Sequence, residues 1–422
     1  MVQKMRKMKD SGIEWIGEIP EGWEIKYFVQ LFSQVKNKNI GLCEKNLLSL
    51  SYGKIKQKSI ETVGGLLPDN FEGYNIIDRN DIVLRLTDLQ NDQHSLRVGL
   101  SHERGIITSA YCSIRVRGAE SPNYLYYYLH TFDVAKGFYG MGSGVRQGLN
   151  WDGLKYIKIL LPPQHEQDRI SVFLNQKTLE IDSMLSKTIS SIEEYKKLKQ
   201  SVITQAVTKT IYDDFGNPSK FRKLRSLCDV LSKGTTPKDI ETQNDEFYCI
   251  RYLKSENIVS NQLNLNPTFF ITAETNNSLE RSKLNSGDIL FVIAGASIGK
   301  VAIATADFLP ANTNQAVAFI RLSSSYQYAT KYIWYFLQSD VVKQLIALSA
   351  VQSAQPNLSL EDLGAIRLPL PDQMGCLKIT DCLDAKCAEI DKLITKKEQL
   401  AKELESYKKS LIYEVVTGKR EV

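Results

Sequence analysis

The same sequence pattern occurs twice in this chain, 209 residues apart. Leu161-Pro162-Pro163-Gln164 opens one copy and Leu370-Pro371-Asp372-Gln373 opens the other, since 370 − 161 = 209. The same spacing relates Glu180-Ile181-Asp182 to Glu389-Ile390-Asp391, and no gap is needed across nearly fifty positions. Repeats of solenoid proteins are about 20 to 50 residues long, so this one indicates a duplicated half-protein. A duplicated half-protein indicates a target with two equivalent parts.

The duplication extends upstream of these copies, with small shifts in spacing. Tyr124–Leu129 precedes its related segment, Tyr332–Leu337, by 208 residues, and Asp81–Leu84 precedes Asp288–Phe291 by 207. These shifts indicate short insertions between matched elements. Each half therefore consists of a variable globular part followed by a well-matched helical part.

The two helical parts carry the apolar spacing of a coiled coil. Apolar or small residues recur at 383, 387, 390, 394, 401, 404, 411 and 415, and at 174, 181, 185, 192, 195, 202 and 206. Steps of four and three predict a helix seam that pairs with another helix. Lys199 and Lys408 interrupt the two seams at matching positions, which predicts two helices that pair with each other in one set register. Each should be roughly 65 Å long.

The globular parts have a different sequence pattern, which predicts short strands separated by turn residues. Runs such as Tyr111–Val116 and Gly287–Ile293, bounded by Gly, Asn and Pro, predict mixed α/β structure over 11–157 and 214–366. Helices are expected from Tyr124 to about Phe138 and from about Tyr326 to Leu348. The predicted class is α+β: two mixed α/β domains joined by two long antiparallel coiled-coil helices, with a pseudo-two-fold internal repeat.

Composition sets limits on location and partners. At 422 residues the chain is too long for one ordinary core. It has no apolar run long enough to span a membrane and no signal-peptide core at its N-terminus, so a cytoplasmic location is expected. The net charge of +5 permits nucleic-acid binding without demanding it.

Two glycine-rich segments resemble nucleotide-binding loops but depart from the required patterns. Gly295–Lys300 has three residues between its glycines instead of four, and Val301 follows the lysine instead of Ser or Thr. A tight turn between two strands is favoured. Gly140-Met-Gly142-Ser-Gly144 follows a predicted helix rather than a strand, which favours a loop over a dinucleotide or S-adenosylmethionine site.

No catalytic or metal site is predicted. The seven cysteines include no CxxC pair and the four histidines are scattered, so neither a zinc site nor a catalytic constellation is indicated. Methyltransferase, nuclease and HExxH motifs are also missing from the sequence. We expect the chain not to be an enzyme.

Polar loops are the candidates for contact with DNA bases. Arginine and lysine read guanine in the major groove, and asparagine and glutamine read adenine. The alternative for any single residue is a solvated loop around an α/β core. The candidates are Arg85, Gln90, Asn91, Gln93, Arg97, Arg146 and Gln147 in the first half, and Ser297, Lys300, Asn312, Asn314 and Gln315 in the second.

Three segments resemble one known family across essentially the whole chain. Ser11–Trp23 resembles the opening signature of the specificity subunits of type I restriction-modification systems. Leu161–Ile170 with Thr178–Asp182 resembles the central helical region of that family. Ala388–Asp391 with Ser410–Gly418 resembles the distal one.

The resemblance implies a division of the chain and a function. Residues 1–160 and 213–369 would be two target-recognition domains, each reading one half of a bipartite double-stranded DNA sequence. Residues 161–212 and 370–422 would be the central and distal repeat helices, which act as a ruler between the domains. The alternative is a coiled-coil adaptor or scaffold that does not read DNA.

The resemblance also implies partners. The helices would dock two modification (methyltransferase) subunits, and restriction (translocase and nuclease) subunits would complete the complex. S-adenosylmethionine would belong to the modification subunit and ATP with Mg²⁺ to the restriction subunit, with no cofactor on this chain. The distal copy departs from the family pattern, because Met374-Gly375-Cys376 stands where His165-Glu166-Gln167 stands in the first. This predicts a weaker start to the second helix and leaves open whether the two helix copies dock partners equally.

Overall fold

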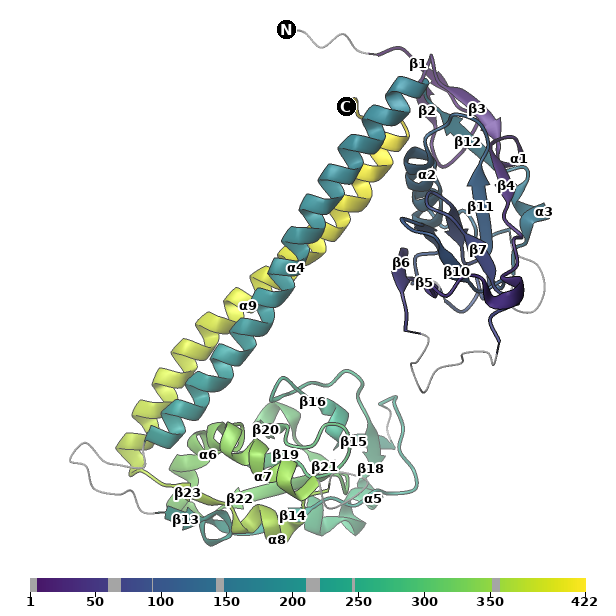
Figure 1. Ribbon diagram of the computed structural model, residues 1–422. Helices are drawn as coiled ribbons and strands as arrows, with labels where there is room; N and C mark the ends of the chain where they lie inside the picture. Colours follow the sequence, from purple (N-terminus) through teal and green to yellow (C-terminus); the bar gives the residue numbers. More distant parts are fainter. Residues whose placement is uncertain are drawn as a thin grey trace. The chain divides into compact units, whose positions relative to one another are not determined.

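The chain forms two compact units that each combine helix and strand. The computed structural model describes residues 6–59, 70–92, 94–141, 148–209, 221–244, 247–350 and 357–422. Unit 1 consists of Met1–Thr188 with Gln399–Val422, and unit 2 of Ile189–Glu398. Each unit contains a globular part and a segment of two long helices, α4 (Gln164–Lys209) and α9 (Gln373–Val416), which pack against each other (Figure 1).

Both units are built around a four-stranded antiparallel sheet with the same strand order. In unit 1 the order is β4-β11-β8-β9, and in unit 2 it is β14-β22-β19-β20. The predicted strands at 81–84 and 111–116 are confirmed as β8 and β11. The strands are β4 (Phe32–Gln34), β11 (Cys112–Val116), β8 (Ile82–Leu84) and β9 (Val98–Leu100), then β14 (Cys228–Lys233), β22 (Val317–Leu322), β19 (Ile289–Val292) and β20 (Val301–Ile303).

Shorter elements complete each unit. Those of unit 1 are β1 (Met8–Asp10), β2 (Glu18–Pro20), β3 (Glu24–Tyr27), α1 (Phe28–Leu31), β5 (Leu48–Ser51), β6 (Lys54–Gln57), β7 (Asn75–Ile77), β10 (Gly105–Ile107), α2 (Pro122–Val134), α3 (Trp151–Leu154) and β12 (Lys158–Leu161). Those of unit 2 are β13 (Phe221–Lys223), β15 (Tyr248–Leu253), β16 (Ile258–Val259), β17 (Gln262–Leu263), β18 (Phe270–Thr272), α5 (Ala273–Ser278), β21 (Ala311–Thr313), α6 (Thr330–Leu337), α7 (Asp340–Ala350), α8 (Leu360–Ala365) and β23 (Arg367–Pro369).

The aromatic-rich helices are shorter than the sequence predicts. Ser121 caps α2 by accepting the Tyr124 backbone N–H, and the helix ends before Lys136, which adopts a left-handed φ of 63°. In unit 2 the prediction of a single helix from about Tyr326 to Leu348 is wrong. It is divided into α6 and α7, and the hydroxyl of Thr204 on α4 accepts the Asp340 N–H at 3.0 Å at the start of α7. A tertiary contact thus decides where this helix begins.

The long helices are antiparallel within each unit and bury part of the predicted seam. In unit 1, Leu174 and Ile181 of α4 join Leu411 and Val415 of α9 in one core cluster. In unit 2 the equivalent cluster contains the predicted residues 383 and 387 of α9, but on α4 it contains residues 203 and 207, each one position after the predicted 202 and 206, which are only partly buried. Apolar burial of this kind supplies most of the stability of a helix pair.

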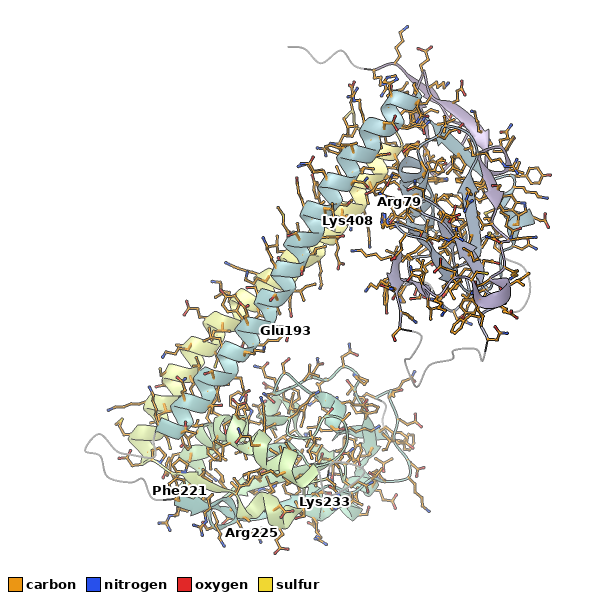
Figure 2. All side chains as sticks on the ribbon, in the orientation of Figure 1. Arg79, Glu193, Phe221, Arg225, Lys233 and Lys408 are labelled. Carbon is orange, nitrogen blue, oxygen red and sulfur yellow. The ribbon has the colours of Figure 1, made fainter. Side chains whose placement is uncertain are left out.

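The two lysines that interrupt the seam each pair with an aspartate of the facing helix. Lys408, labelled in Figure 2, belongs to α9. Its Nζ lies 2.6 Å from Asp182 Oδ1 in unit 1, and Lys199 Nζ lies 2.6 Å from Asp391 Oδ2 in unit 2. Both residues of one pair are related to those of the other by the 209-residue repeat. Partly exposed ion pairs contribute only about 0–1 kcal/mol each. We therefore infer that the two ion pairs mainly fix the register of α4 against α9. The prediction that these helices pair in a set register is confirmed.

The two long helices begin with different contacts. At the start of α4, Glu166 accepts a hydrogen bond from Trp23 Nε1 at 2.9 Å and forms an ion pair with Arg6. Cys376 occupies the equivalent of Gln167 and is buried. The weaker start of α9 stays a prediction; Asp372 Oδ1 caps this helix by accepting the Gly375 N–H at 2.7 Å. Among the described residues, no helix is both long and apolar enough to cross a membrane.

Candidate nucleic-acid interface

The polar residues singled out in both halves lie mainly on one equivalent hairpin. The loop 85–97 joins β8 to β9 in unit 1, and the loop 293–300 joins β19 to β20 in unit 2. The Arg85 N–H donates to the Arg97 carbonyl at 2.9 Å, and the Val292 N–H donates to the Lys300 carbonyl at 2.9 Å. These matching bonds make Arg97 and Lys300 equivalent positions at the ends of two loops of different length.

The unit 1 loop presents three of its predicted residues. Gln90 and Asn91 are exposed, and the side-chain amide of Asn91 donates to Asp88 Oδ1 at 2.8 Å. The Arg85 guanidinium is one-third exposed and lies 3.6 Å from the Asp92 carboxylate. This loop can therefore offer amide and guanidinium groups to a base edge. Gln93, Arg146 and Gln147 lie outside the described residues.

The prediction of direct DNA contact is wrong for two residues, because their side chains are buried. Arg97 is 0% exposed, and its guanidinium is fully occupied by acceptors within unit 1. Asn312 in β21 is also 0% exposed, and its amide donates to Asn276 Oδ1 at 3.0 Å and to the Leu279 carbonyl at 3.2 Å. In this conformation neither side chain can reach DNA.

The unit 2 loop is the tight turn that the sequence favours. Gly295 and Gly299 have φ values of 87° and 86°, a region that glycine adopts without steric cost. The loop connects antiparallel neighbours, so the strand–turn–strand prediction is confirmed. Lys300 is exposed and Ser297 is half-buried. Asn314 and Gln315 lie apart from them in sequence, between β21 and β22, with Gln315 exposed.

A second hairpin of unit 1 has features of a DNA-binding surface that we did not predict. Tyr52, at the turn between β5 and β6, is 77% exposed. Lys54, Lys56 and Lys58 follow it and are all exposed, although Lys54 Nζ also lies 3.1 Å from Asp182 Oδ2 of α4. Alternate residues of a strand share one face, so the Lys-x-Lys-x-Lys pattern was the available signal. Lysines bind phosphates and an exposed ring can stack on a base.

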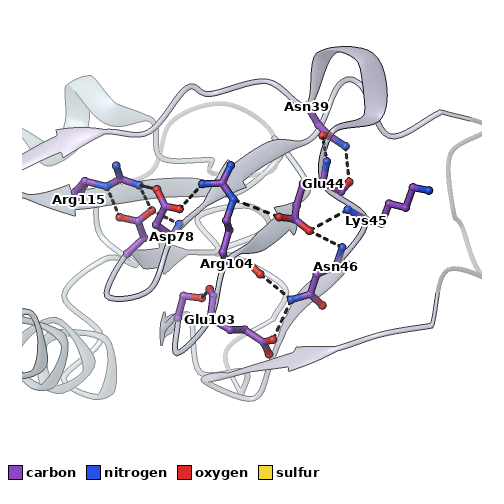
Figure 3. A network of polar contacts seen from close by, with 10 residues as sticks. Asn39, Glu44, Lys45, Asn46, Asp78, Glu103, Arg104 and Arg115 are labelled. Atoms are coloured by element: carbon purple, nitrogen blue, oxygen red, sulfur yellow. Dashed lines mark hydrogen bonds and ion pairs between the residues drawn. The ribbon is translucent and has the colours of Figure 1, made fainter.

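Charged side chains brace the loops behind this surface. Arg104 links the Glu44 carboxylate, at 3.3 Å, to that of Asp78, at 2.8 Å (Figure 3). The backbone N–H of Asn46 is the main cause that lowers the pKa of Glu44 below its usual range. Arg115 on β11 continues the network to Asp78 and to the buried Asp81. Fixed charges of this kind hold irregular segments in one arrangement.

A cavity of about 520 Å³ lies between the β5–β6 hairpin and helices α2, α4 and α9 of unit 1. His130 of α2 lines it, and His130 Nδ1 is buried without a hydrogen-bond partner among the described residues. Burial, followed by the charges of Lys408 and Lys409, lowers the pKa of His130 to about 4. Because of this low pKa, His130 is neutral at pH 7. The repeat places Gln338 at the equivalent position of unit 2.

This histidine predicts that unit 1 loses stability in acid. Its pKa is lower in the folded state than the ordinary value near 6.5, so the unfolded chain takes up a proton that the folded unit does not. Stability is lost as the pH falls from about 6.5 toward 4, by up to about 3 kcal/mol. His130→Gln should remove this part of the loss in urea unfolding curves at pH 7 and 4.5. His102→Gln, at an exposed position, is the control. Equal acid losses in the His130→Gln and unmodified chains would contradict the assignment.

Comparisons with known proteins agree with this architecture. Residues 217–402 match the family model described as the type I restriction modification DNA specificity domain. The type I restriction enzyme MjaVIII specificity subunit of Methanocaldococcus jannaschii is 23% identical over 418 residues, covering 95% of this chain and 93% of that protein. Among solved structures, a chain from work on complex assembly and conformational transition of the type I R-M system gives a TM-score of 0.71 at 14% identity, covering 95% of this chain and 99% of that one. The HsdS subunit of Thermoanaerobacter tengcongensis gives 0.50 at 14%, covering 95% and 98%.

Two α/β units with the same strand order, each with a segment of the same long helix pair, agree with the architecture of DNA specificity domains of this kind. The matched domain and the full-length relatives carry the assignment further. Residues 217–402 match the type I DNA specificity domain, and nearly the whole chain is similar to type I restriction enzyme specificity subunits.

Proposed function

We propose that this chain gives a type I restriction-modification complex its DNA specificity and catalyses no reaction itself. Residues 1–160 and 213–369 act as two recognition domains, each reading one half of a bipartite sequence. One observation carries the proposal: the two sheets share a strand order, while the hairpin loops at 85–97 and 293–300 differ in length and side chains. A common scaffold with different loops suits a target whose two halves differ.

The long helices act as both spacer and docking surface in this proposal. In unit 1, Val172 and Leu179 of α4 are 68% and 70% exposed. In unit 2, Met374 of α9 is 60% exposed. Exposed apolar side chains on an otherwise polar helix favour burial against a partner, here two modification subunits that also support the restriction subunits. S-adenosylmethionine, ATP and Mg²⁺ then act on those partners.

A methylation experiment tests the proposal. Cells producing this chain together with its modification subunit are expected to carry methylated adenines in one gapped motif, detected by sequencing that reports modified bases. Each subunit alone should give no such motif. A modification subunit with an inactivated methyl-transfer site is the matched control and should also give none. An ungapped motif, or methylation without this chain, would contradict the proposal.

A further inference from the structure

Arg97 uses every N–H group of its buried guanidinium within unit 1. Guanidinium groups have five N–H donors, and five acceptors surround this one. Nε donates to the Tyr139 hydroxyl at 3.1 Å. The other four acceptors are main-chain carbonyls of a single loop. They belong to Arg85 at 3.1 Å, Thr87 at 2.8 Å, Asp88 at 3.2 Å, and Asp92.

These bonds add to the loop's own main-chain bonds, such as that from the Asp92 N–H to the Asp88 carbonyl at 3.2 Å. Loop carbonyls turned toward the interior have no strand partner, and an unpaired buried carbonyl costs about 1–3 kcal/mol. Asp88 has a left-handed φ of 57°, which is unfavourable for a residue with a side chain. The carbonyls turn inward to the guanidinium, while Thr87, Gln90 and Asn91 are exposed. Arg97 therefore determines which side chains the loop presents.

Arg97 also ties the loop to helix α2 and to the residues that follow it. The Arg97 backbone N–H donates to the Asp133 carboxylate of α2 at 2.6 Å. The Tyr139 ring, which follows that helix, lies 5.0 Å from the guanidinium carbon, within the range of a cation–π contact. Helix α2 is fixed in turn to α4, because the Tyr127 hydroxyl lies 3.1 Å from that of Thr178. An unbroken set of contacts thus joins the loop to the helix pair.

Unit 2 closes its equivalent loop without a buried arginine. Its shorter loop closes on main-chain bonds, including Gly299 N–H to the Val292 carbonyl at 2.9 Å. The position equivalent to Arg97 is Lys300, which is exposed. A buried arginine is therefore required only where the loop is long.

We propose that Arg97 is a positioning residue that sets the specificity of unit 1 by fixing the conformation of residues 85–92. This inference rests on the proposed function, in which that loop reads one half-site. Arg97 touches no base; it acts through the residues whose carbonyls it binds. Its loss should affect one half-site and leave the other unchanged.

The test uses Arg97→Met in the complex with the modification subunit. The measured quantity is discrimination: the ratio of initial methylation rates on the cognate duplex and on duplexes with one base pair changed in either half-site. We expect discrimination to fall by about tenfold or more at one half-site and to hold at the other. Arg97→Lys should restore part of it, because an ammonium has three donors. Arg79→Met, the same change at an exposed arginine of unit 1, is the control and should have no half-site-selective effect.

Hydrogen exchange separates this inference from the proposed function. Amides of residues 85–92 should exchange faster in Arg97→Met than in the unmodified chain, whether or not the complex methylates DNA. Unchanged exchange, or equal loss at both half-sites, would overturn the positioning role. The absence of any gapped motif in the unmodified complex would overturn the proposed function instead. If Arg97→Met does not fold, Tyr139→Phe removes one acceptor and keeps the ring; it should speed loop exchange less, and no change would overturn the inference.

Discussion

Replacing Asp81 by alanine is expected to lower the free energy of unfolding of unit 1 by about 3 kcal/mol. The Asp81 side chain is 1% exposed and accepts three hydrogen bonds. Two come from Arg115, Nε and Nη2, each at 2.7 Å, and one from the Asp78 N–H at 2.7 Å. Alanine would leave a buried N–H unpaired and remove the bidentate partner of the arginine, which joins β8 to β11.

Unit 2 has an equivalent buried aspartate that binds an arginine, and this pair allows a matched test. Asp288 is also 1% exposed, accepts the Asn285 N–H at 2.7 Å, and binds Arg321 Nε and Nη2 at 2.9 and 2.7 Å. Asp288→Ala should therefore destabilise unit 2 by a similar amount. Native-state hydrogen exchange resolves the two units, since each substitution should raise exchange mainly in the core strands of its own unit.

The control is Asp78→Ala, at a carboxylate that binds the same arginine from a side chain that is 38% exposed. It should cost less than about 1 kcal/mol. Equal losses for Asp78→Ala and Asp81→Ala would show that burial of the carboxylate does not decide its contribution.

The helix pair could be predicted from sequence because its information is local and periodic. A seam at steps of three and four marks one face of a helix. The matching interruptions at Lys199 and Lys408 indicated register, and each lysine in fact pairs with an aspartate, Asp391 or Asp182. The duplication added the strand equivalences, because Asp81–Leu84 and Asp288–Phe291 align without any structural knowledge.

The loops could not be predicted to the same depth, because residue type does not reveal what surrounds a side chain. Arg97 and Lys300 end equivalent loops, yet the first is buried and the second exposed. The difference depends on four carbonyls that converge only when the chain is folded. Asn312 was misassigned for the same reason. The β5–β6 hairpin did carry a signal, since Lys54, Lys56 and Lys58 alternate along a strand, but alternation alone does not distinguish a DNA-facing strand from a solvated one.

Lengthening both long helices by seven residues is expected to widen the gap in the recognised DNA sequence by about three base pairs. Seven residues are one heptad, which keeps the seam in phase and adds about 10 Å of helix, while each DNA base pair adds about 3.4 Å. The insertions belong between residues 190 and 191 of α4 and between 399 and 400 of α9. Both points lie midway between the two Asp–Lys pairs, so each pair keeps its facing partner.

The measurement is the methylated motif in cells producing the lengthened chain with the modification subunit. Both half-sites should keep their bases, because the loops proposed to read them are unchanged, and only the gap should grow. Inserting seven residues into α4 alone is the control. It moves Lys199 out of register with Asp391, or Asp182 with Lys408, and should abolish efficient methylation rather than shift the gap. If the doubly lengthened chain keeps the original gap, the separation of the half-sites is set by something other than these helices, and the ruler role is wrong.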